Sequence, residues 1–386
     1  MLGKAVLPYP LFHRSNIPPF QSAFDYLECE MKAALLGLMQ SGKSTIFSAI
    51  SGKAIPMAGL NVIEEAIVPV PDERLLWLEK LYKPQKRVHA TMDVLDLPGF
   101  SFTDEHGRTA ARRLIGQIRT VDMLVLVVRA FEDPSVPPYR NSVNPKRDLA
   151  ELQTELLLAD LELVTTRIEK LEKQVTKPTK TQAQDKAELA LQKRLQEAIE
   201  AEKPISSAVQ TEDELTIIKS LGFLTLKPMA VVINVGENDL EKSFDLGEVM
   251  GGSVPVVTMS AKLEHELAQL DEESRATFMS DLGIKESAAE KFVKICYSAL
   301  GLISFLTVGP DEVRAWPIRK GTIAVDAAGK VHSDIKRGFI RAETMAYDDL
   351  KTLGEEKAVK AAGKMRLEGK EYVVKDGDII NFRFNV

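Results

Sequence analysis

The sequence has few cysteines, no long apolar run and no strong charge of either sign. Its two cysteines, Cys29 and Cys296, cannot form a framework of disulfide bonds. No apolar run approaches the roughly 20 residues that cross a bilayer, so we expect neither a membrane protein nor a membrane partner. The net charge of −6 gives no indication of DNA binding. We therefore expect a cytoplasmic protein, and we expect it to be a monomer.

The 386 residues, 45% of them hydrophobic, are enough for two or three domains with cores of their own. Residues 1–30 are rich in proline and aromatic residues and show no clear periodicity. We interpret them as an extension upstream of a natural first residue at Met31, with a functional arm as the alternative. A secretory leader is not expected, because Pro8 and Pro10 interrupt the short apolar stretch.

From residue 32 to about residue 144, strand-like and helix-like segments alternate, which is typical of an α/β fold with a mostly parallel sheet. Strands are expected in AALLGL, RVHATMDVLDL and DMLVLVVRA, and further along the chain in PMAVVINV and SVPVVTMSAK. Helices are expected near 263–281 and 286–300. From residue 302 the sequence becomes rich in glycine and β-type residues, which predicts a separate small domain.

The segment 145–204 interrupts the α/β pattern. Its apolar residues recur at three- and four-residue spacing among charged ones: Leu149, Leu152, Leu156, Ala159 and Leu163, then Val164, Ile168, Leu171 and Val175. The stretch TKPTKTQ breaks this pattern, and a second run carries Ala187, Leu191, Leu195 and Ala198. Two such runs joined by a polar turn predict an α-helical hairpin of coiled-coil type.

The stretch GLMQSGKST follows an expected strand, precedes an expected helix and fits the pattern G-x-x-x-x-G-K-[ST]. Glycines let backbone N–H groups curl around phosphates, and a helix N-terminus favours negative charge. We predict that Lys43, as an exposed loop residue, reaches the β- and γ-phosphates and that the Ser44 hydroxyl binds Mg²⁺. The expected nucleotide-binding residues of this loop are Gly37, Gln40, Ser41, Gly42, Lys43, Ser44 and Thr45.

A second motif, VLDLPG, ends the strand that follows the phosphate loop. Asp96 at a strand terminus is suited to hold Mg²⁺ through a water molecule, so the predicted metal residues are Ser44 and Asp96. The N–H of Gly99 can contact a γ-phosphate, which makes Gly99 and Lys43 candidate catalytic residues. A capping aspartate in a Pro-Gly turn is the alternative.

A third motif, AVVINVGEND, is apolar and then abruptly polar, as a buried parallel strand is at its end. In guanine-nucleotide switches such a strand ends in Asn-Lys-x-Asp, which reads the base. Here the residues at the three reading positions are Asn234, Val235 and Glu237. Ser260 and Ala261 follow the last expected strand, where a backbone N–H can approach a base, with a helix cap as the alternative.

Together these stretches resemble the Obg-like ATPase (YchF) family of translation-factor-class P-loop NTPases. The phosphate loop, VPVPDERL, VDMLVLVVRAFED, the start of the hairpin, INVGE, MSAKLEHEL and most of the chain from LISFLTVGPDEVRAW onward carry the likeness. The resemblance implies a P-loop G domain at 31–301, interrupted by the hairpin at 145–204, and a C-terminal TGS domain of β-grasp shape at 302–386. It also implies ATP binding, ATP hydrolysis that is slow without a partner, and association with ribosomes.

The end of the third motif favours adenine over guanine. Guanine offers two donors, N1–H and N2–H₂, to the aspartate of the motif, whereas adenine has an acceptor at N1 and no 2-amino group. Glu237 is one methylene longer than aspartate, and Val235 replaces the lysine whose stem lies along the base. Asn234 can still bond N7, which both purines share. The family's Asn-x-x-Glu variant goes with adenine; a strand end without a role in base recognition is the alternative.

The sequence departs from the family in three places. The stretch 53–72 contains no Ser or Thr, so the threonine expected to close on Mg²⁺ is missing. Glu64 or Glu65 can substitute for it, or the metal keeps a water molecule. The glycine-rich second switch is replaced by FSFTDEHGRTAARRL, and the phosphate loop has Met39 and Gln40 where the family has Pro-Asn.

The attacking water is not positioned by the glutamine of Ras-like proteins, because Phe100 follows Gly99. His106 in the same loop is a candidate catalytic residue, with a solvated histidine as the alternative. Three arginines can supply positive charge in cis or form a solvated helix face: Arg108, Arg112 and Arg113.

Two basic regions suggest a partner. From residue 302 onward, 15 Lys and Arg stand against 13 Asp and Glu, and the hairpin turn adds Lys170, Lys173, Lys177, Lys180 and Lys186. A solvated helix face is the alternative for these lysines. Because the chain resembles a ribosome-associated family, we predict that both regions contact the ribosome or ribosomal RNA. The rival functions are a GTPase of the same fold and a ribosome-binding adaptor that senses nucleotide with little hydrolysis.

Overall fold

The computed structural model of the protein describes residues 31–55, 62–201, 203, 205–246, 254–281, 284 and 286–385. The expected extension at 1–30 therefore lies outside the described residues. The chain forms two compact units. Unit 1 comprises Lys32–Ala66 and Val94–Ala289, and unit 2 comprises Ile67–Asp93 and Glu290–Val386, together with Met31.

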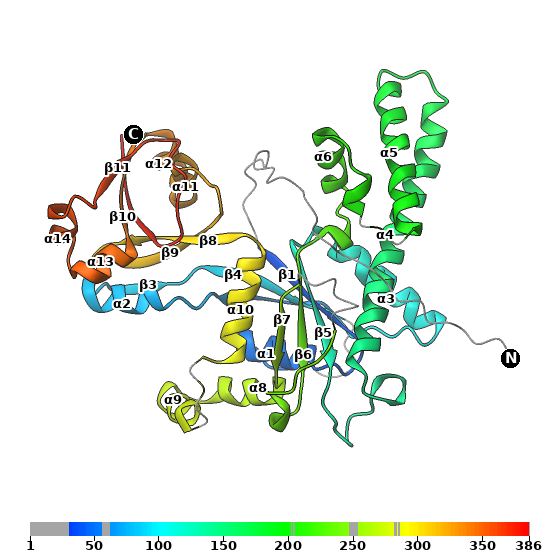
Figure 1. The fold of residues 1–386 in the computed structure, drawn as a ribbon, viewed down its shortest axis with the longest axis horizontal. Coiled ribbons are helices and arrows are strands. Elements are labelled where there is room, and N and C mark those ends of the chain that lie inside the picture. The colour runs from blue at the N-terminus through cyan, green and yellow to red at the C-terminus, as the bar shows by residue number, and fades with distance from the viewer. Residues whose placement is uncertain are drawn as a thin grey trace. The chain divides into compact units, whose positions relative to one another are not determined.

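The first sheet has six strands in the order β2-β4-β1-β5-β6-β7 (Figure 1). Their bounds are Glu64–Pro69 (β2), Thr91–Asp96 (β4), Lys32–Gly37 (β1), Met123–Arg129 (β5), Met229–Asn234 (β6) and Val256–Met259 (β7). The pairs β1–β5, β5–β6 and β6–β7 are parallel, and every residue of β5 is buried. The mostly parallel sheet is thus confirmed. In a parallel sheet the carboxyl ends of the strands share one edge, where ligands bind.

One expected strand is in fact two. The stretch RVHATMDVLDL divides into β3 (Lys86–Val88) and β4, with His89 and Ala90 between them. The division arises because β3 pairs in parallel with β9 (Glu312–Arg319) of the second sheet, whereas β4 belongs to the first. Sequence periodicity cannot tell which sheet a strand will join.

Besides the hairpin, the described helices of unit 1 are α1 (Lys43–Ser51), α3 (Glu105–Gln117), α6 (Glu212–Ser220), α8 (Ala261–Gln269) and α9 (Glu272–Asp281). The prediction of one helix near 263–281 is wrong, because the chain leaves the helix at Leu270. Asp271 then accepts a hydrogen bond from the Ser274 N–H at 2.8 Å, which starts a new helix. The expected helix near 286–300 is α10 (Ala288–Ala299).

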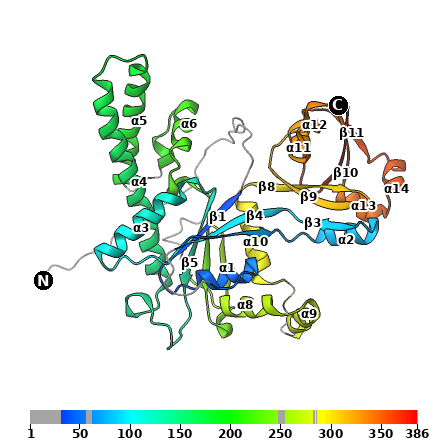
Figure 2. The same ribbon diagram turned by 180° about the vertical axis from the view of Figure 1, so that it is seen from behind.

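The helical hairpin is formed by α4 (Pro145–Val175) and α5 (Gln182–Glu200), which lie side by side in both views (Figures 1 and 2). Asn144 caps α4 by accepting from the Arg147 N–H, and proline stands at the first turn. The buried residues of the two helices include Leu152, Leu156, Val164, Ile168, Leu171, Leu191 and Leu195. Among the described residues, no helix is long and apolar enough to cross a membrane.

Unit 2 has a sheet in the order β11-β10-β12-β8-β9-β3. The remaining bounds are Leu302–Val308 (β8), Phe339–Ala346 (β10), Arg366–Glu368 (β11) and Asp378–Phe384 (β12), with helices Ala324–Val331 (α11), Ser333–Arg337 (α12), Tyr347–Leu353 (α13) and Glu356–Ala361 (α14). An antiparallel β8–β9 pair, a parallel β8–β12 pair and an antiparallel β10–β12 pair make up a β-grasp fold. Its core includes Phe305, Trp316, Phe339 and Phe382.

Unit 2 also contains a segment from much earlier in the chain, residues 67–93. Its helix α2 (Glu73–Tyr82) places the Arg74 guanidinium 2.8 Å from the Asp376 carboxylate. Trp77 of the same helix meets Tyr347 edge to face, with 5.6 Å between the ring centroids. The domain boundary expected between residues 301 and 302 stays a prediction; by its contacts, this earlier segment belongs with the C-terminal strands.

Candidate functional site

The phosphate loop lies between β1 and α1 at the carboxyl edge of the first sheet. Gly37 is the last residue of β1, and Gly42 takes the left-handed conformation, with φ of 88°, directly before α1 begins at Lys43. A Cβ atom on Gly42 would lie 2.0 Å from the Asn234 Nδ2 atom, so no other residue fits there. No side chain caps α1 at Gly42, so its first N–H groups are available to phosphate oxygens.

Lys43 is not the exposed loop residue that we expected. It is the first residue of α1 and is only 5% exposed. Burial lowers the pKa of its ammonium group, and the nearby negative charge of Asp96 partly opposes this shift. A buried cation that faces a carboxylate has lost most of its water and is ready to take up phosphate oxygens.

Asp96 ends β4 and is buried, with 4% of its surface exposed. Burial raises the pKa of its carboxyl group, whereas Lys43 and a hydrogen bond from Ser44 lower it. Its Oδ1 atom is buried without a hydrogen-bond partner. An orphaned carboxylate oxygen beside a serine hydroxyl fits a magnesium site, because Mg²⁺ binds through few carboxylates and completes its shell with water and phosphate. Among the described residues, no three His, Cys, Asp or Glu side chains form a metal-binding cluster.

The turn after β4 packs closely against the phosphate loop. A Cβ atom on Gly99 would lie 2.8 Å from the Met39 Cα, so only glycine permits this approach. The Met39 N–H donates to the Phe100 carbonyl at 2.9 Å, and the Phe100 N–H donates to the Gly37 carbonyl at 3.0 Å. The Phe100 side chain is buried and packs near Phe102, so it contributes to the core and cannot orient a water molecule.

Asn234, the last residue of β6, connects three parts of the site. Its Nδ2 donates to the Ser41 carbonyl at 2.9 Å, and its Oδ1 accepts from the Ala261 N–H at 2.9 Å. The side chain is 3% exposed. An amide NH₂ group carries two hydrogens, so the bond to the phosphate loop is compatible with the predicted contact to a purine N7. The sequence predicted the contact with the base but not this second, bracing role.

Val235 and Glu237, the two other residues of the expected base-reading motif, differ in burial and in their partners. Val235 is buried, and its N–H donates to the Met259 carbonyl at 2.9 Å. Glu237 is exposed, and its carboxylate lies 2.8 Å from the Lys262 Nζ atom. The hydrogen bond and charge of Glu237 raise the pKa of Lys262. We did not predict this ion pair, although the stretch Ser-Ala-Lys after β7 supplied the signal.

Ser260 caps α8 by accepting a hydrogen bond from the Leu263 N–H, which is the alternative considered for it. The cap leaves Ala261 beside Asn234, the residue expected to contact the base, because the Ala261 N–H donates to the Asn234 Oδ1 atom. The phosphate loop, the end of β6 and the start of α8 therefore meet at one place in unit 1.

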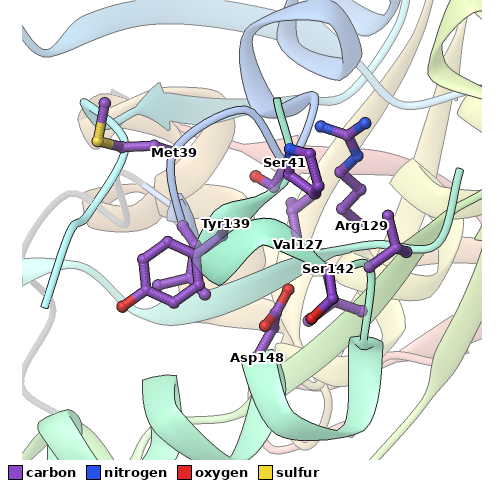
Figure 3. A pocket seen from close by; sticks show the side chains of 11 residues that line it. Met39, Ser41, Val127, Arg129, Tyr139, Ser142 and Asp148 are labelled. Carbon is purple, nitrogen blue, oxygen red and sulfur yellow. The ribbon is translucent and has the colours of Figure 1, made fainter. Parts of the chain in front are cut away.

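The Ser41 side chain has neighbours near the start of α4. It lines a small pocket with Tyr139, Ser142 and Asp148, from the start of α4 and the loop before it (Figure 3). The Ser41 hydroxyl is buried and lacks a hydrogen-bond partner. Burial raises the pKa of Asp148, and its hydrogen bond from Arg147 opposes the shift. The predicted role of Ser41 toward phosphate therefore rests on its backbone.

The candidate residues of the second switch lie on α3. His106 is exposed in the first turn of this helix, and the Arg108 Nε donates to the Phe102 carbonyl at 3.1 Å. Arg108 and Arg112 lie close enough to Glu155 of α4 to lower its pKa, which burial raises. Their charges are therefore directed at least partly toward α4. The catalytic role of His106 stays a prediction.

The described part of the first switch contains both glutamates that the sequence offered in place of threonine; residues 56–61 lie outside the described residues. Glu64 is half-buried at the start of β2, and it acts on Asp96 by raising its pKa. Glu65 is exposed and forms an ion pair with Lys32 at 3.1 Å. The two neighbouring carboxylates thus have different surroundings.

Comparison with known proteins places this site in a family. The chain is 40% identical to "Ribosome-binding ATPase YchF" of Bacillus subtilis, over 92% of the chain and 100% of the relative. The chain belongs to the YchF/Obg-like ATPase family. It is 37% identical to "Ribosome-binding ATPase YchF" of Escherichia coli O157:H7 over 92% of the chain and 99% of that relative. It is 38% identical to "Obg-like ATPase 1" of Oryza sativa subsp. japonica over 92% of each protein.

The family is also evident in the C-terminal block and in a solved structure. A family model named YchF-GTPase_C, described as a protein of unknown function, matches residues 302–385. The "Structure of the Schizosaccharomyces pombe YchF GTPase" superposes with a TM-score of 0.76 at 33% identity, over 92% of this chain and 98% of that one. The predicted family and fold class are confirmed.

Proposed function

We propose that the protein binds and hydrolyses ATP with Mg²⁺ and acts as a ribosome-associated regulator. The observation that carries the proposal is the cluster of buried Lys43, half-buried Ser44 and buried Asp96, in which one Asp96 oxygen lacks a partner. Relatives that span nearly the whole chain are named ribosome-binding ATPases, and this supports both ATP hydrolysis and association with ribosomes.

In this proposal each residue of the site has its own role toward the triphosphate. Lys43 and the N–H groups at the start of α1 hold the β- and γ-phosphates and stabilise the negative charge that develops on the transferred group. Ser44 and Asp96 would hold Mg²⁺, which when bound neutralises charge between the β- and γ-phosphates. The Gly99 N–H contacts the γ-phosphate, and the close packing of Gly99 on Met39 keeps that N–H in place.

The base is selected where Asn234 and Glu237 meet α8. We expect ATP to bind on the order of 100-fold or more tightly than GTP, because guanine needs an acceptor for N1–H and N2–H₂. The Glu237 carboxylate is instead paired with Lys262. Equilibrium titrations with ATP, ADP, GTP and GDP in the presence of Mg²⁺ measure this preference, together with the turnover rate for ATP and for GTP.

The matched variant for this experiment is Glu237→Asp, which shortens the carboxylate toward the guanine-reading length. We expect this variant to reduce the ratio of the affinity for ATP to the affinity for GTP. Equal affinity of the unaltered protein for GTP and ATP would instead favour the rival GTPase. Tight ATP binding with negligible turnover would favour the nucleotide-sensing adaptor, which the absence of Ser and Thr from 53–72 supports.

The ribosome is the proposed partner of the hairpin tip and of unit 2. The five tip lysines are exposed, and we expect them to contact RNA phosphates: Lys170, Lys173, Lys177, Lys180 and Lys186. Because each neutralised phosphate releases counterions, affinity should fall on the order of 100-fold between about 50 and 200 mM salt. Co-sedimentation with ribosomes measures this, and binding should be stronger with a non-hydrolysable ATP analogue than with ADP.

Two sets of substitutions at the tip separate charge from structure. Changing the five lysines to glutamate should release the protein from ribosomes, whereas changing them to arginine should preserve binding, because arginine keeps the positive charge. If the protein does not co-sediment with ribosomes under any condition, it is a free ATPase without this partner. If it co-sediments regardless of salt and of both sets of substitutions, the tip lysines are not the contact with RNA.

A further inference from the structure

The start of β2 and the end of β4 lie at the same place in the first sheet. The two strands are neighbours in the sheet. Val70, which follows β2, donates its N–H to the carbonyl of Ala90, which precedes β4, at 2.7 Å. Since the end of one strand is bonded to the beginning of its neighbour, the strands run antiparallel. Counting back along this register puts Glu64 directly opposite Asp96.

The burial pattern of the two strands agrees with this register. In β2, Ala66 and Val68 are buried, whereas Glu65, Ile67 and Pro69 are exposed. In β4, Met92 and Val94 are buried and lie opposite Val68 and Ala66 in the same register. Opposite residues of an antiparallel pair share one face of the sheet, with Cβ atoms about 4.5–5.5 Å apart. The carboxylates of Glu64 and Asp96 therefore share the buried face.

Glu65 points the other way, because successive side chains of a strand alternate between faces. Its carboxylate is half exposed and is held by Lys32, at 3.1 Å. Its carbonyl oxygen accepts a hydrogen bond from the Lys53 ammonium group. Of the two glutamates in the threonine-free segment, only Glu64 can reach the site of Asp96.

The charges at this place favour a divalent cation. Two carboxylates, Glu64 and Asp96, lie near one ammonium group, that of Lys43. The Oδ1 atom of Asp96 is buried without a hydrogen-bond partner and supplies an acceptor for such a cation or its water.

We propose that Glu64 helps to hold the magnesium ion, by accepting a hydrogen bond from one of its water molecules, in the place of a switch threonine. This inference rests on the proposed function, since it concerns the same metal ion. Mg²⁺ retains several waters in such sites, and a carboxylate is a strong acceptor for them. Glu64 is thus a positioning residue for the metal and does not touch the reacting phosphate.

The test is the affinity of the full-length protein with bound ADP for Mn²⁺, read from the electron paramagnetic resonance signal of the free ion. We expect Glu64→Gln to raise the dissociation constant for Mn²⁺ about 10-fold or more, as loss of a hydrogen-bonding partner of a metal shell does. Glu65→Gln is the matched control, because it removes the neighbouring charge from the other face, and it should leave Mn²⁺ affinity unchanged.

Two further measurements separate the possible failures. The affinity for ADP in EDTA should be the same for the unaltered protein and Glu64→Gln. If Glu64→Gln lowers this metal-free affinity by a similar factor to its affinity for Mn²⁺, Glu64 has a structural role and the inference is overturned. Asp96→Asn should weaken Mn²⁺ binding strongly. If it does so while Glu64→Gln has no effect, Glu64 is not involved and the proposed function stands. If neither variant changes Mn²⁺ binding, the metal lies elsewhere and both proposals fail.

Discussion

Replacing Lys43 with alanine is expected to lower ATP turnover about 100- to 1,000-fold, with a parallel loss of affinity for the triphosphate. The Lys43 side chain is 5% exposed at the first turn of α1, beside the buried carboxylate of Asp96. Where water is excluded, a charge-assisted contact with phosphate is stronger than at the surface. Single-turnover hydrolysis and titration with a fluorescent ATP analogue measure the two losses separately.

Lys43→Met is the matched variant, because it keeps an unbranched stem in the buried position and removes only the charge. We expect it to be as inactive as Lys43→Ala, whereas packing defects should affect the alanine variant alone. Near-normal affinity of Lys43→Met for ATP would mean that the phosphates bind elsewhere. Circular dichroism of both variants checks that the helix content of the fold is unchanged.

The sequence was most informative where one local segment determines the structure. The phosphate loop could be predicted because its glycines are required by geometry: a Cβ on Gly42 would collide with Asn234, and one on Gly99 with the backbone of Met39. The strands β1, β5 and β6 could be predicted because a parallel strand buried on both faces has a nearly continuous apolar sequence. The predicted start of the hairpin at residue 145 coincides with an Asn-Pro cap.

The sequence was less informative where a residue's role depends on a distant partner. The charge that lies near Lys43 comes from Asp96, and the second role of Asn234 depends on the Ser41 carbonyl and the Ala261 N–H. The grouping of residues 67–93 with the C-terminal strands depends on contacts such as that between Arg74 and Asp376. None of these partners is adjacent in sequence, so the spacing of apolar and polar residues along a segment does not reveal them.

In the hairpin, the spacing of residues indicated that one position is buried but not which residue contacts it. The apolar spacing suggested that Ala159 faces the partner helix, but the fully buried position of this turn is Asp160. The signal was present, because Asp160 continues the four-residue spacing from Leu156 to Val164. A charged residue at such a position indicates a buried partner, and the partner is Arg119, which follows α3.

Replacing Asp160 with alanine is expected to reduce the free energy of unfolding of unit 1 by about 3–5 kcal/mol. Asp160 is 0% exposed, and its carboxylate accepts from the Arg119 Nη1 at 2.8 Å and from the Leu224 N–H at 3.1 Å. It also accepts from the N–H and the hydroxyl of Thr225, at 2.9 Å and 2.8 Å. Removing the carboxylate leaves two buried N–H groups without their acceptor and takes the ion-pair partner from the partly buried Arg119 guanidinium, which costs far more than the pair contributes.

Two measurements test this expectation, and a nearby residue provides the control. Urea unfolding gives the change in stability, while hydrogen exchange at the Leu224 and Thr225 amides should show local loss of protection. Glu162→Ala, two residues further along the exposed side of α4, should change stability by no more than about 0.5 kcal/mol. Asp160→Leu combined with Arg119→Met should be less harmful than Asp160→Ala alone, because no unpaired charge stays buried. If the double variant were as unstable as the sum of its single changes, the carboxylate and the guanidinium would not act as a pair.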